Sequence, residues 1–162
     1  MSAPGAYIAV VAAGETERAP LVSQLTASGY DVVSGGVAVL QQRAYPPELV
    51  VVAGRDAPEI IRNLVARPEV ADLPILAAVA ALPPTLPVQA LSAGATDVAT
   101  LPIPTSVLAA RCRVLMQRTR AHLAVSPLLT RCHQILASDV DDMAALTRVI
   151  AVLADGIGFT RG

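Results

Sequence analysis

The sequence predicts an α/β fold, a five-stranded doubly wound parallel sheet with strand order 2-1-3-4-5 and a C-terminal helical extension. Short apolar runs alternate along the chain with longer segments of helical periodicity. The runs are apolar almost throughout, which is typical of strands buried on both faces of a parallel sheet. Strands that alternate with helices form right-handed crossovers, and 2-1-3-4-5 is a common order for one domain of this size.

Five segments are expected to be strands. Each is short, rich in Val, Ile, Leu or Ala, and bounded by turn residues. The run Leu49–Val52 gives the clearest signal because all four of its residues are apolar. The predicted strands are Tyr7–Val11, Asp31–Val33, Leu49–Val52, Ile75–Val79 and Val98–Leu101.

Five helices are expected between and after these strands. Gly29 closes the first helix, since glycine readily adopts the left-handed conformation of a C-terminal cap. Pro58 suits a first helical turn, and Thr105 or Ser106 is available to cap the last helix. The predicted helices are Glu17–Ser28, Val37–Arg43, Pro58–Ala66, Val88–Ala93 and Thr105–His122.

The composition argues against several functions. The net charge is -1 and the chain has no Trp, three Tyr and one Phe, so neither a basic patch nor a base-stacking surface is expected and no nucleic-acid partner is predicted. All 12 basic residues are Arg. Chemistry that needs a lysine ammonium, such as a Schiff base or a nucleotide-binding P-loop, is therefore excluded.

A cytoplasmic location without a membrane partner is expected. Cys112 and Cys132 lie far apart and form no paired motif, which favours a reducing compartment, and the N-terminus lacks a signal-peptide pattern. Residues 73–96 carry no charge, but four prolines interrupt them. Because proline breaks helices, a buried strand followed by a proline-rich loop explains this stretch better than a membrane span.

Residues 6–122 resemble the receiver domain of bacterial response regulators, the CheY-like family of two-component signalling. The resemblance implies a flavodoxin/CheY-like fold. It depends on motifs at the ends of several strands and helices. The motifs are Ser28–Val33 for "GY-x-V", Pro47–Val52 for "PDLVLLD", Asp72–Ile75 for "LPVI", Ala90–Asp97 for "ALEAGADD" and Leu101–Ile103 for "KPF".

The same resemblance implies that the phosphorylation site has been lost. Receivers bind Mg²⁺ with an acidic pair after the first strand, accept a phosphoryl group on an aspartate after the third, and contact it with a hydroxyl and a lysine from the last two strands. These positions fall here on Ala12 and Ala13, on Ala53, on Val79 and on Leu101, while the switch aromatic falls on Val98. We expect a pseudo-receiver with no metal, no cofactor and no enzymatic activity.

Polar residues near the lost site are interpreted as surface residues. Glu15 and Asp56 could form a displaced metal site or a substitute acceptor, but solvated loop carboxylates are the simpler interpretation, and Arg55 could neutralise a neighbouring carboxylate. No glycine-rich phosphate-binding motif follows any strand. Cys112, His122, Cys132 and His133 do not have the spacing of a zinc site, and His133 does not lie in a kinase-like phosphotransfer motif.

Residues 123–162 are predicted to form a helical linker or dimerisation segment. Helices are expected over His122–Ala137 and Asp141–Ala154, with Ser138 and Asp139 as candidate caps. Apolar residues step by three and four, as in a coiled-coil seam with one polar member, Asp139. The seam consists of Leu129, Cys132, Leu136, Met143, Leu146, Ile150 and Leu153. It predicts a homodimer; packing on the chain's own α/β domain or a two-helix bundle are the alternatives.

Residues 136–162 also look like the opening helix of a GAF sensory domain. The pattern includes Ser138, Asp139, Leu146, Arg148–Ile150 and Gly158. This similarity implies that the chain is the N-terminal part of a longer protein.

A signalling module that acts through protein–protein contacts is the leading hypothesis. It would regulate another signalling protein or a downstream output domain. A small-ligand sensor using the vacated pocket at the carboxyl ends of the strands is the first alternative, because open α/β sheets bind ligands there. A flavodoxin-like enzyme is the second.

Overall fold

The computed structural model describes residues 7–70, 72–120 and 150. The chain divides into two compact units, Met1–Thr119 and Arg120–Gly162. The first unit contains the α/β domain. In the second, Ile150 is helical, with its side chain 61% exposed. The helices predicted for the tail, its dimerisation seam apart from Ile150, and the GAF-like pattern lie outside the described residues.

The α/β unit is built on a five-stranded parallel sheet with the order β2-β1-β3-β4-β5, as the sequence predicts. In the register, Val11 lies opposite Val52, Ala53 opposite Ala78, and Ala80 opposite Leu101. The carboxyl ends of the central strands therefore meet at one edge of the sheet. The strands are β1 (Ile8–Val11), β2 (Val32–Gly35), β3 (Leu49–Ala53), β4 (Ile75–Ala80) and β5 (Asp97–Leu101).

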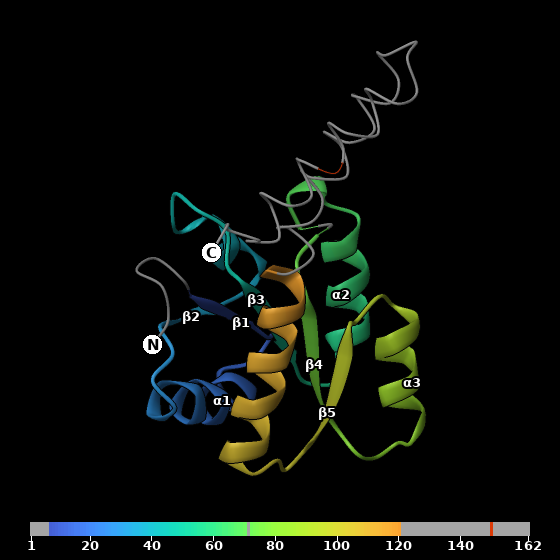
Figure 1. Ribbon diagram of the computed structural model, residues 1–162. Coiled ribbons are helices and arrows are strands. Elements are labelled where there is room, and N and C mark those ends of the chain that lie inside the picture. Colours follow the sequence, from blue (N-terminus) through green and yellow to red (C-terminus); the bar gives the residue numbers. More distant parts are fainter. Residues whose placement is uncertain (1–6, 71, 121–149, 151–162) are drawn as a thin grey trace. The chain divides into compact units, whose positions relative to one another are not determined.

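Helices cover both faces of the sheet (Figure 1). α1 and the helix over residues 105–120 lie on one face, and α2 and α3 lie on the other. Two short 3-10 turns, η1 and η2, complete the unit. The bounds are α1 (Glu15–Ala27), η1 (Val37–Gln41), α2 (Ala57–Val65), η2 (Pro68–Val70) and α3 (Thr85–Ser92).

Three helical predictions need correction. The segment predicted as the helix Val37–Arg43 is the 3-10 turn η1, in which only Val39 is buried, so it offers too little apolar surface to hold a longer helix against the sheet. α3 begins at Thr85, before Pro87, because proline is tolerated in a first turn. Pro104 caps the last helix, its carbonyl accepting from Leu108 N at 3.0 Å, so neither Thr105 nor Ser106 does.

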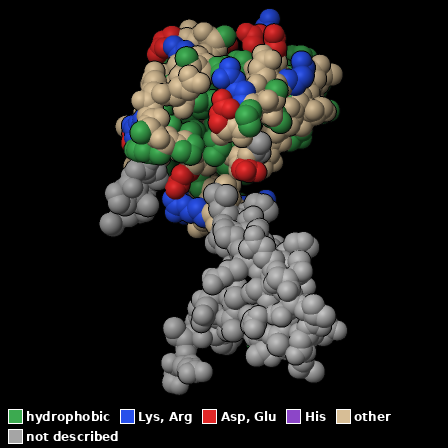
Figure 2. Space-filling model, turned by 90° about the horizontal axis from the view of Figure 1, so that it is seen from above, with side chains coloured by type: hydrophobic (Ala, Val, Ile, Leu, Met, Phe, Trp, Pro, Cys, Tyr) green, Lys and Arg blue, Asp and Glu red, His purple; other side chains and the backbone are tan. Residues whose placement is uncertain are grey.

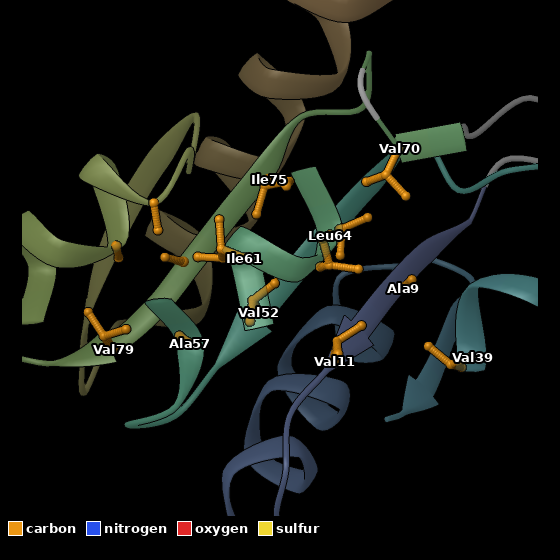
Figure 3. Packing of buried hydrophobic residues seen from close by; sticks show 14 of the residues in the cluster. Ala9, Val11, Val39, Val52, Ala57, Ile61, Leu64, Val70, Ile75 and Val79 are labelled. Carbon is orange, nitrogen blue, oxygen red and sulfur yellow. The ribbon is translucent and has the colours of Figure 1, made fainter. Parts of the chain in front are cut away.

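The core consists of two apolar clusters, one on each face of the sheet. Alternate residues of β1 divide between them, Ala9 and Val11 toward α2 and η1, and Ile8 and Val10 toward α1. Figure 3 shows the first cluster, in which Val11, Val39 and Val52 come from three different elements. Full burial of such a side chain contributes roughly 1.5–3 kcal/mol, so the clusters hold the strand ends in place.

The uncharged stretch 73–96 forms β4, the proline-containing loop after it and α3. This confirms the interpretation as a strand followed by a loop. In the part of the chain that the structure describes, no helix is both long and apolar enough to cross a membrane.

Candidate functional site

The candidate site lies at the edge of the sheet where the strands end, the lower edge in Figure 1. Ala12 follows β1 and Ala53 ends β3, and both side chains are buried in the cluster that faces α1. Leu101 is half-buried against the same cluster, whereas Ala13 is exposed. The structure therefore brings together three of the five positions that the sequence singles out.

Val79 does not join them. Its side chain is buried in the opposite cluster, near Ala57 (Figure 3). Val98, at the switch position, is half-buried against that opposite cluster too. The two positions thus contribute to packing under α2 and α3 and present no polar group.

The chemistry available at this edge is limited. A methyl group at Ala53 cannot attack phosphorus, and methyl groups at Ala12 and Ala13 cannot bind a cation. Mg²⁺ is held in proteins mainly by carboxylate oxygens and water. Within residues 7–70 and 72–120, no three His, Cys, Asp or Glu side chains gather in a way that could hold a metal ion.

Glu17 is a site residue that the sequence analysis did not identify. Its Oε2 accepts a hydrogen bond from the backbone N–H of Gly14 at 3.1 Å. A Cβ placed on Gly14 would lie 2.8 Å from Oε2, and one placed on Gly54 would lie 2.7 Å from Oε1. The carboxylate of Glu17 therefore fills a notch between the loop after β1 and the loop after β3.

Gly54 makes this contact possible. Its φ of +97° lies in the left-handed region, which residues other than glycine rarely adopt. Its N–H donates to the carbonyl of Ala78 at 3.2 Å, which continues the β3–β4 ladder past Ala53. Any side chain here would meet the Glu17 carboxylate, so the glycine and the glutamate depend on each other.

Arg18 places a positive charge over the end of β1. Its guanidinium donates to the carbonyl of Ala12 at 3.2 Å and forms an ion pair with Glu15. The Arg18 side chain is only 18% exposed, and its Nε is buried without a hydrogen-bond partner in the described part of the chain. A cation thus lies beside the strand end, although the chain has no lysine.

The remaining candidates near the site are on the surface. Glu15 is largely exposed and pairs with Arg18. Arg55 and Asp56 are exposed in the loop that leads into α2, and among the described residues no ion pair involves either. These placements agree with the interpretation of Glu15 and Asp56 as solvated carboxylates.

Part of this arrangement leaves a trace in the sequence. Glu17 stands three residues after Gly14, the spacing at which a glutamate reaches back to the N–H that precedes a helix. That spacing predicts the Gly14 bond. It does not predict the approach to Gly54, which depends on how the sheet brings two loops together.

Comparison with solved structures settles the fold. The receiver domain of a signal transduction histidine kinase from Syntrophus aciditrophicus matches with a TM-score of 0.58 at 23% identity, covering 70% of this chain and 91% of that one. This chain has the receiver-domain fold. The receiver domain of sensor histidine kinase PA1611 from Pseudomonas aeruginosa PAO1, with a magnesium ion coordinated in its active site cleft, matches with a TM-score of 0.57 at 20% identity, covering 70% and 98%.

NtrX from Brucella abortus contains a similar region within a longer protein. It matches with a TM-score of 0.63 at 19% identity, and the match covers 76% of this chain but 29% of that one. No protein-family model matches the chain. No curated protein matches it either. The receiver fold therefore rests on three-dimensional similarity and on the sheet order.

Proposed function

We propose that this chain is a receiver-like signalling module that takes up no phosphoryl group and acts through protein–protein contacts. One observation carries the proposal. The end of β3, where the acceptor aspartate of the receiver family belongs, holds the buried methyl group of Ala53. Ala12 and Ala13 stand where the family has its metal-binding pair.

The chain's own charges support this reading. The Glu17 carboxylate lies between the loops after β1 and β3, and the Arg18 guanidinium is bonded to the carbonyl of Ala12. Phosphoryl transfer depends on a nucleophile and on cations positioned around the transferred group. A carboxylate in the notch repels an incoming phosphoryl group, and no nucleophilic side chain ends β3.

The same contacts favour one fixed arrangement of the two loops. A receiver changes state because a phosphoryl group alters the contacts at the strand ends. Here the Glu17 carboxylate is bonded to Gly14 in the loop after β1 and lies close to Gly54 in the loop after β3, without any added group. We infer that the module presents a constant binding surface and that its partner or its assembly state supplies the regulation.

The partners proposed are a second copy of the chain and a downstream output domain or another signalling protein. The apolar seam in residues 129–153 is the reason for the dimer, and the GAF-like pattern in residues 136–162 is the reason for an output domain. No catalytic function is proposed for the module.

The ligand-sensor alternative at the strand ends has weaker support. The side chains of Glu17 and Arg18 both reach toward that edge. The Glu17 carboxylate fills the notch between the loops after β1 and β3, so a ligand bound there would have to displace it.

Incubation with acetyl phosphate and Mg²⁺, followed by intact mass measurement, tests the proposal. We expect no gain of a phosphoryl group, while a receiver that keeps its acidic pair and aspartate gains one under the same conditions. The Asp56→Asn variant serves as the second arm, because Asp56 is the nearest exposed carboxylate after β3. A stoichiometric gain in the wild type that disappears in Asp56→Asn would show that Asp56 is a substitute acceptor and would overturn the proposal.

A further inference from the structure

A cavity of about 400 Å³ lies at the edge of the sheet opposite to the candidate site, near the start of β3 and β4. It opens between the segment that follows η1 and the segment that contains η2. Figure 2 looks onto this end of the molecule, where acidic and basic side chains are interspersed with apolar ones. Pockets for small organic ligands usually have volumes of about 300–1,000 Å³, so the cavity suits a small molecule.

Most of the wall is apolar. Leu40 and Leu73 are half-buried, and Pro47 and Val70 are buried. Such a wall favours the apolar body of a ligand because it removes hydrocarbon from water. The apolar residues that line it are Leu40, Ala44, Pro46, Pro47, Val70 and Leu73.

An aromatic ring is held in place at one side of the cavity. Tyr45 is 42% exposed and packs edge-on against the ring of Tyr7, with centroids 5.6 Å apart. The hydroxyl of Tyr7 donates to the carbonyl of Tyr45 at 3.1 Å, and the guanidinium of Arg43 lies 4.7 Å from the Tyr7 ring centroid. The guanidinium of Arg43 also donates to the Tyr45 hydroxyl at 3.3 Å. Because this bond and the edge contact with Tyr7 hold the Tyr45 ring, its open side can receive a flat ring with little loss of side-chain entropy.

Of the two arginines that line the cavity, only Arg67 has no ion-pair partner among the described residues. Arg43 is committed to Asp31, to which it donates through two nitrogens at 2.5 and 2.8 Å. Arg67 lines the cavity half-buried, and within residues 7–70 and 72–120 no ion pair engages it. Glu69 adds one exposed carboxylate. A ligand with several negative charges is disfavoured here, whereas a single negative charge placed against Arg67 is favoured.

We propose that this cavity binds a planar aromatic molecule with one anionic group, of the aromatic carboxylate or sulfonate class. The ring lies against Tyr45 and the apolar wall, and the anion accepts from the guanidinium of Arg67. The cavity is far from the alanine positions of the candidate site, so the inference is independent of whether the chain takes up phosphate.

Two fluorescent probes test it, the monoanion 8-anilinonaphthalene-1-sulfonate and its uncharged counterpart N-phenyl-1-naphthylamine. We expect saturable fluorescence enhancement by the anion with one site per chain. Arg67→Gln should lower the affinity for the anionic probe by roughly tenfold, the change expected for loss of one charge-assisted hydrogen bond. The affinity for the uncharged probe should stay the same.

Matched variants complete the experiment. Tyr45→Phe keeps the aromatic ring and should bind both probes as the wild type does. Tyr45→Ala removes the ring and should lower the affinity for both probes. Arg62→Gln removes an exposed arginine of α2 that does not line the cavity and should change nothing. Circular dichroism checks that each variant is folded. Enhancement that does not saturate, or that is equal in the wild type, Arg67→Gln and Tyr45→Ala, overturns the proposal.

Discussion

At the scale of single residues, Gly54 is constrained twice. Its φ of +97° disfavours any side chain, and a Cβ would lie 2.7 Å from Oε1 of Glu17. We therefore expect Gly54→Ala to lower the free energy of unfolding by roughly 1–3 kcal/mol, the usual cost of such backbone strain, with the contact adding to it. Urea denaturation followed by circular dichroism measures the change.

Gly29 provides the matched control for Gly54. Its φ is +84°, but a Cβ there would have nothing within 4 Å. Gly29→Ala should therefore show the backbone cost alone. Because Glu17→Ala also removes the bond to Gly14, the double variant with Gly54→Ala is compared with Glu17→Ala alone, and in that background Gly54→Ala should cost no more than Gly29→Ala costs in the wild type. If Gly54→Ala costs no more than Gly29→Ala, the Glu17 contact does not constrain the loop.

Cys112 illustrates how burial controls reactivity. Its side chain is fully buried on the face covered by α1, and this burial raises the pKa of the thiol to about 12. Because the thiolate is the reactive form, native Cys112 should resist iodoacetamide at pH 8 and react once guanidinium unfolds the chain. Peptide mapping by mass spectrometry separates its label from that of Cys132. Rapid labelling of native Cys112 would contradict the prediction.

At the scale of elements, the segment after η1 is held by Arg43. The guanidinium of Arg43 pairs with Asp31 and lies over the ring of Tyr7, and the hydrogen bond from Arg43 lowers the pKa of the Asp31 carboxyl. A lowered pKa means that the folded state favours the carboxylate. The contribution to stability is complete above the ordinary Asp pKa of about 3.9 and is lost as pH falls through the lower folded value.

Asp31→Asn should therefore melt at a lower temperature than the wild type at pH 7. The difference should shrink below about pH 4 and in concentrated salt, because the pair is exposed. Asp72→Asn, which changes an exposed carboxylate outside this pair, should have no such pH dependence. Thermal melts at several pH values check both. A difference that persists unchanged at pH 2 would show that the charge of Asp31 is not its source.

The elements show how far the sequence determines the fold. All five strands form within two residues of their predicted bounds. The central strands β1, β3 and β4 are buried almost throughout, as their apolar runs predict, whereas the edge strands β2 and β5 are only partly buried. The segment of η1 has helical spacing but only one buried residue, so tertiary packing decided its form. The sequence predicts β3 to end at Val52, one residue before the observed end at Ala53. The meeting of Glu17 with Gly54 was not predictable from the sequence, since it joins loops that only the sheet brings together.

A second cavity, of about 360 Å³, lies between the start of β5 and the helix over residues 105–120. Arg111 crosses it to pair with Asp97 at 2.6 Å, which links the helix to the edge strand. Both partners are partly exposed, so the pair contributes little to stability. The contact between this helix and the sheet is instead maintained by three buried apolar residues of the helix, Leu108, Cys112 and Leu115.

At the scale of the whole molecule, the two compact units contribute differently. The unit Met1–Thr119 contains its own two-sided core, with no polar or charged side chain buried among the described residues. It needs no second unit to bury its sheet. The homodimer through the seam and the GAF-like similarity remain predictions from the sequence.

Dimerisation by the tail is the prediction that tests the molecule as a whole. Apolar residues from Leu129 to Leu153 repeat at intervals of three and four, which places them along one helical stripe. Burying each Leu or Ile contributes roughly 1.5–3 kcal/mol, and a charge placed there loses this contribution and must also be desolvated. Leu146→Asp combined with Ile150→Asp should give monomers by light scattering, with the α/β unit still folded by circular dichroism.

The matched control adds the same two charges beside the seam, as Ala144→Asp with Ala151→Asp, and should remain dimeric because those positions lie outside the stripe. A wild type that is monomeric at tens of micromolar would rule out the dimer. A charge in a seam between two copies should separate the copies and leave the α/β unit of each one folded. If the seam variant instead unfolds the α/β unit, the stripe packs on that unit. The two circular dichroism outcomes thus distinguish a contact between copies from a contact within one chain.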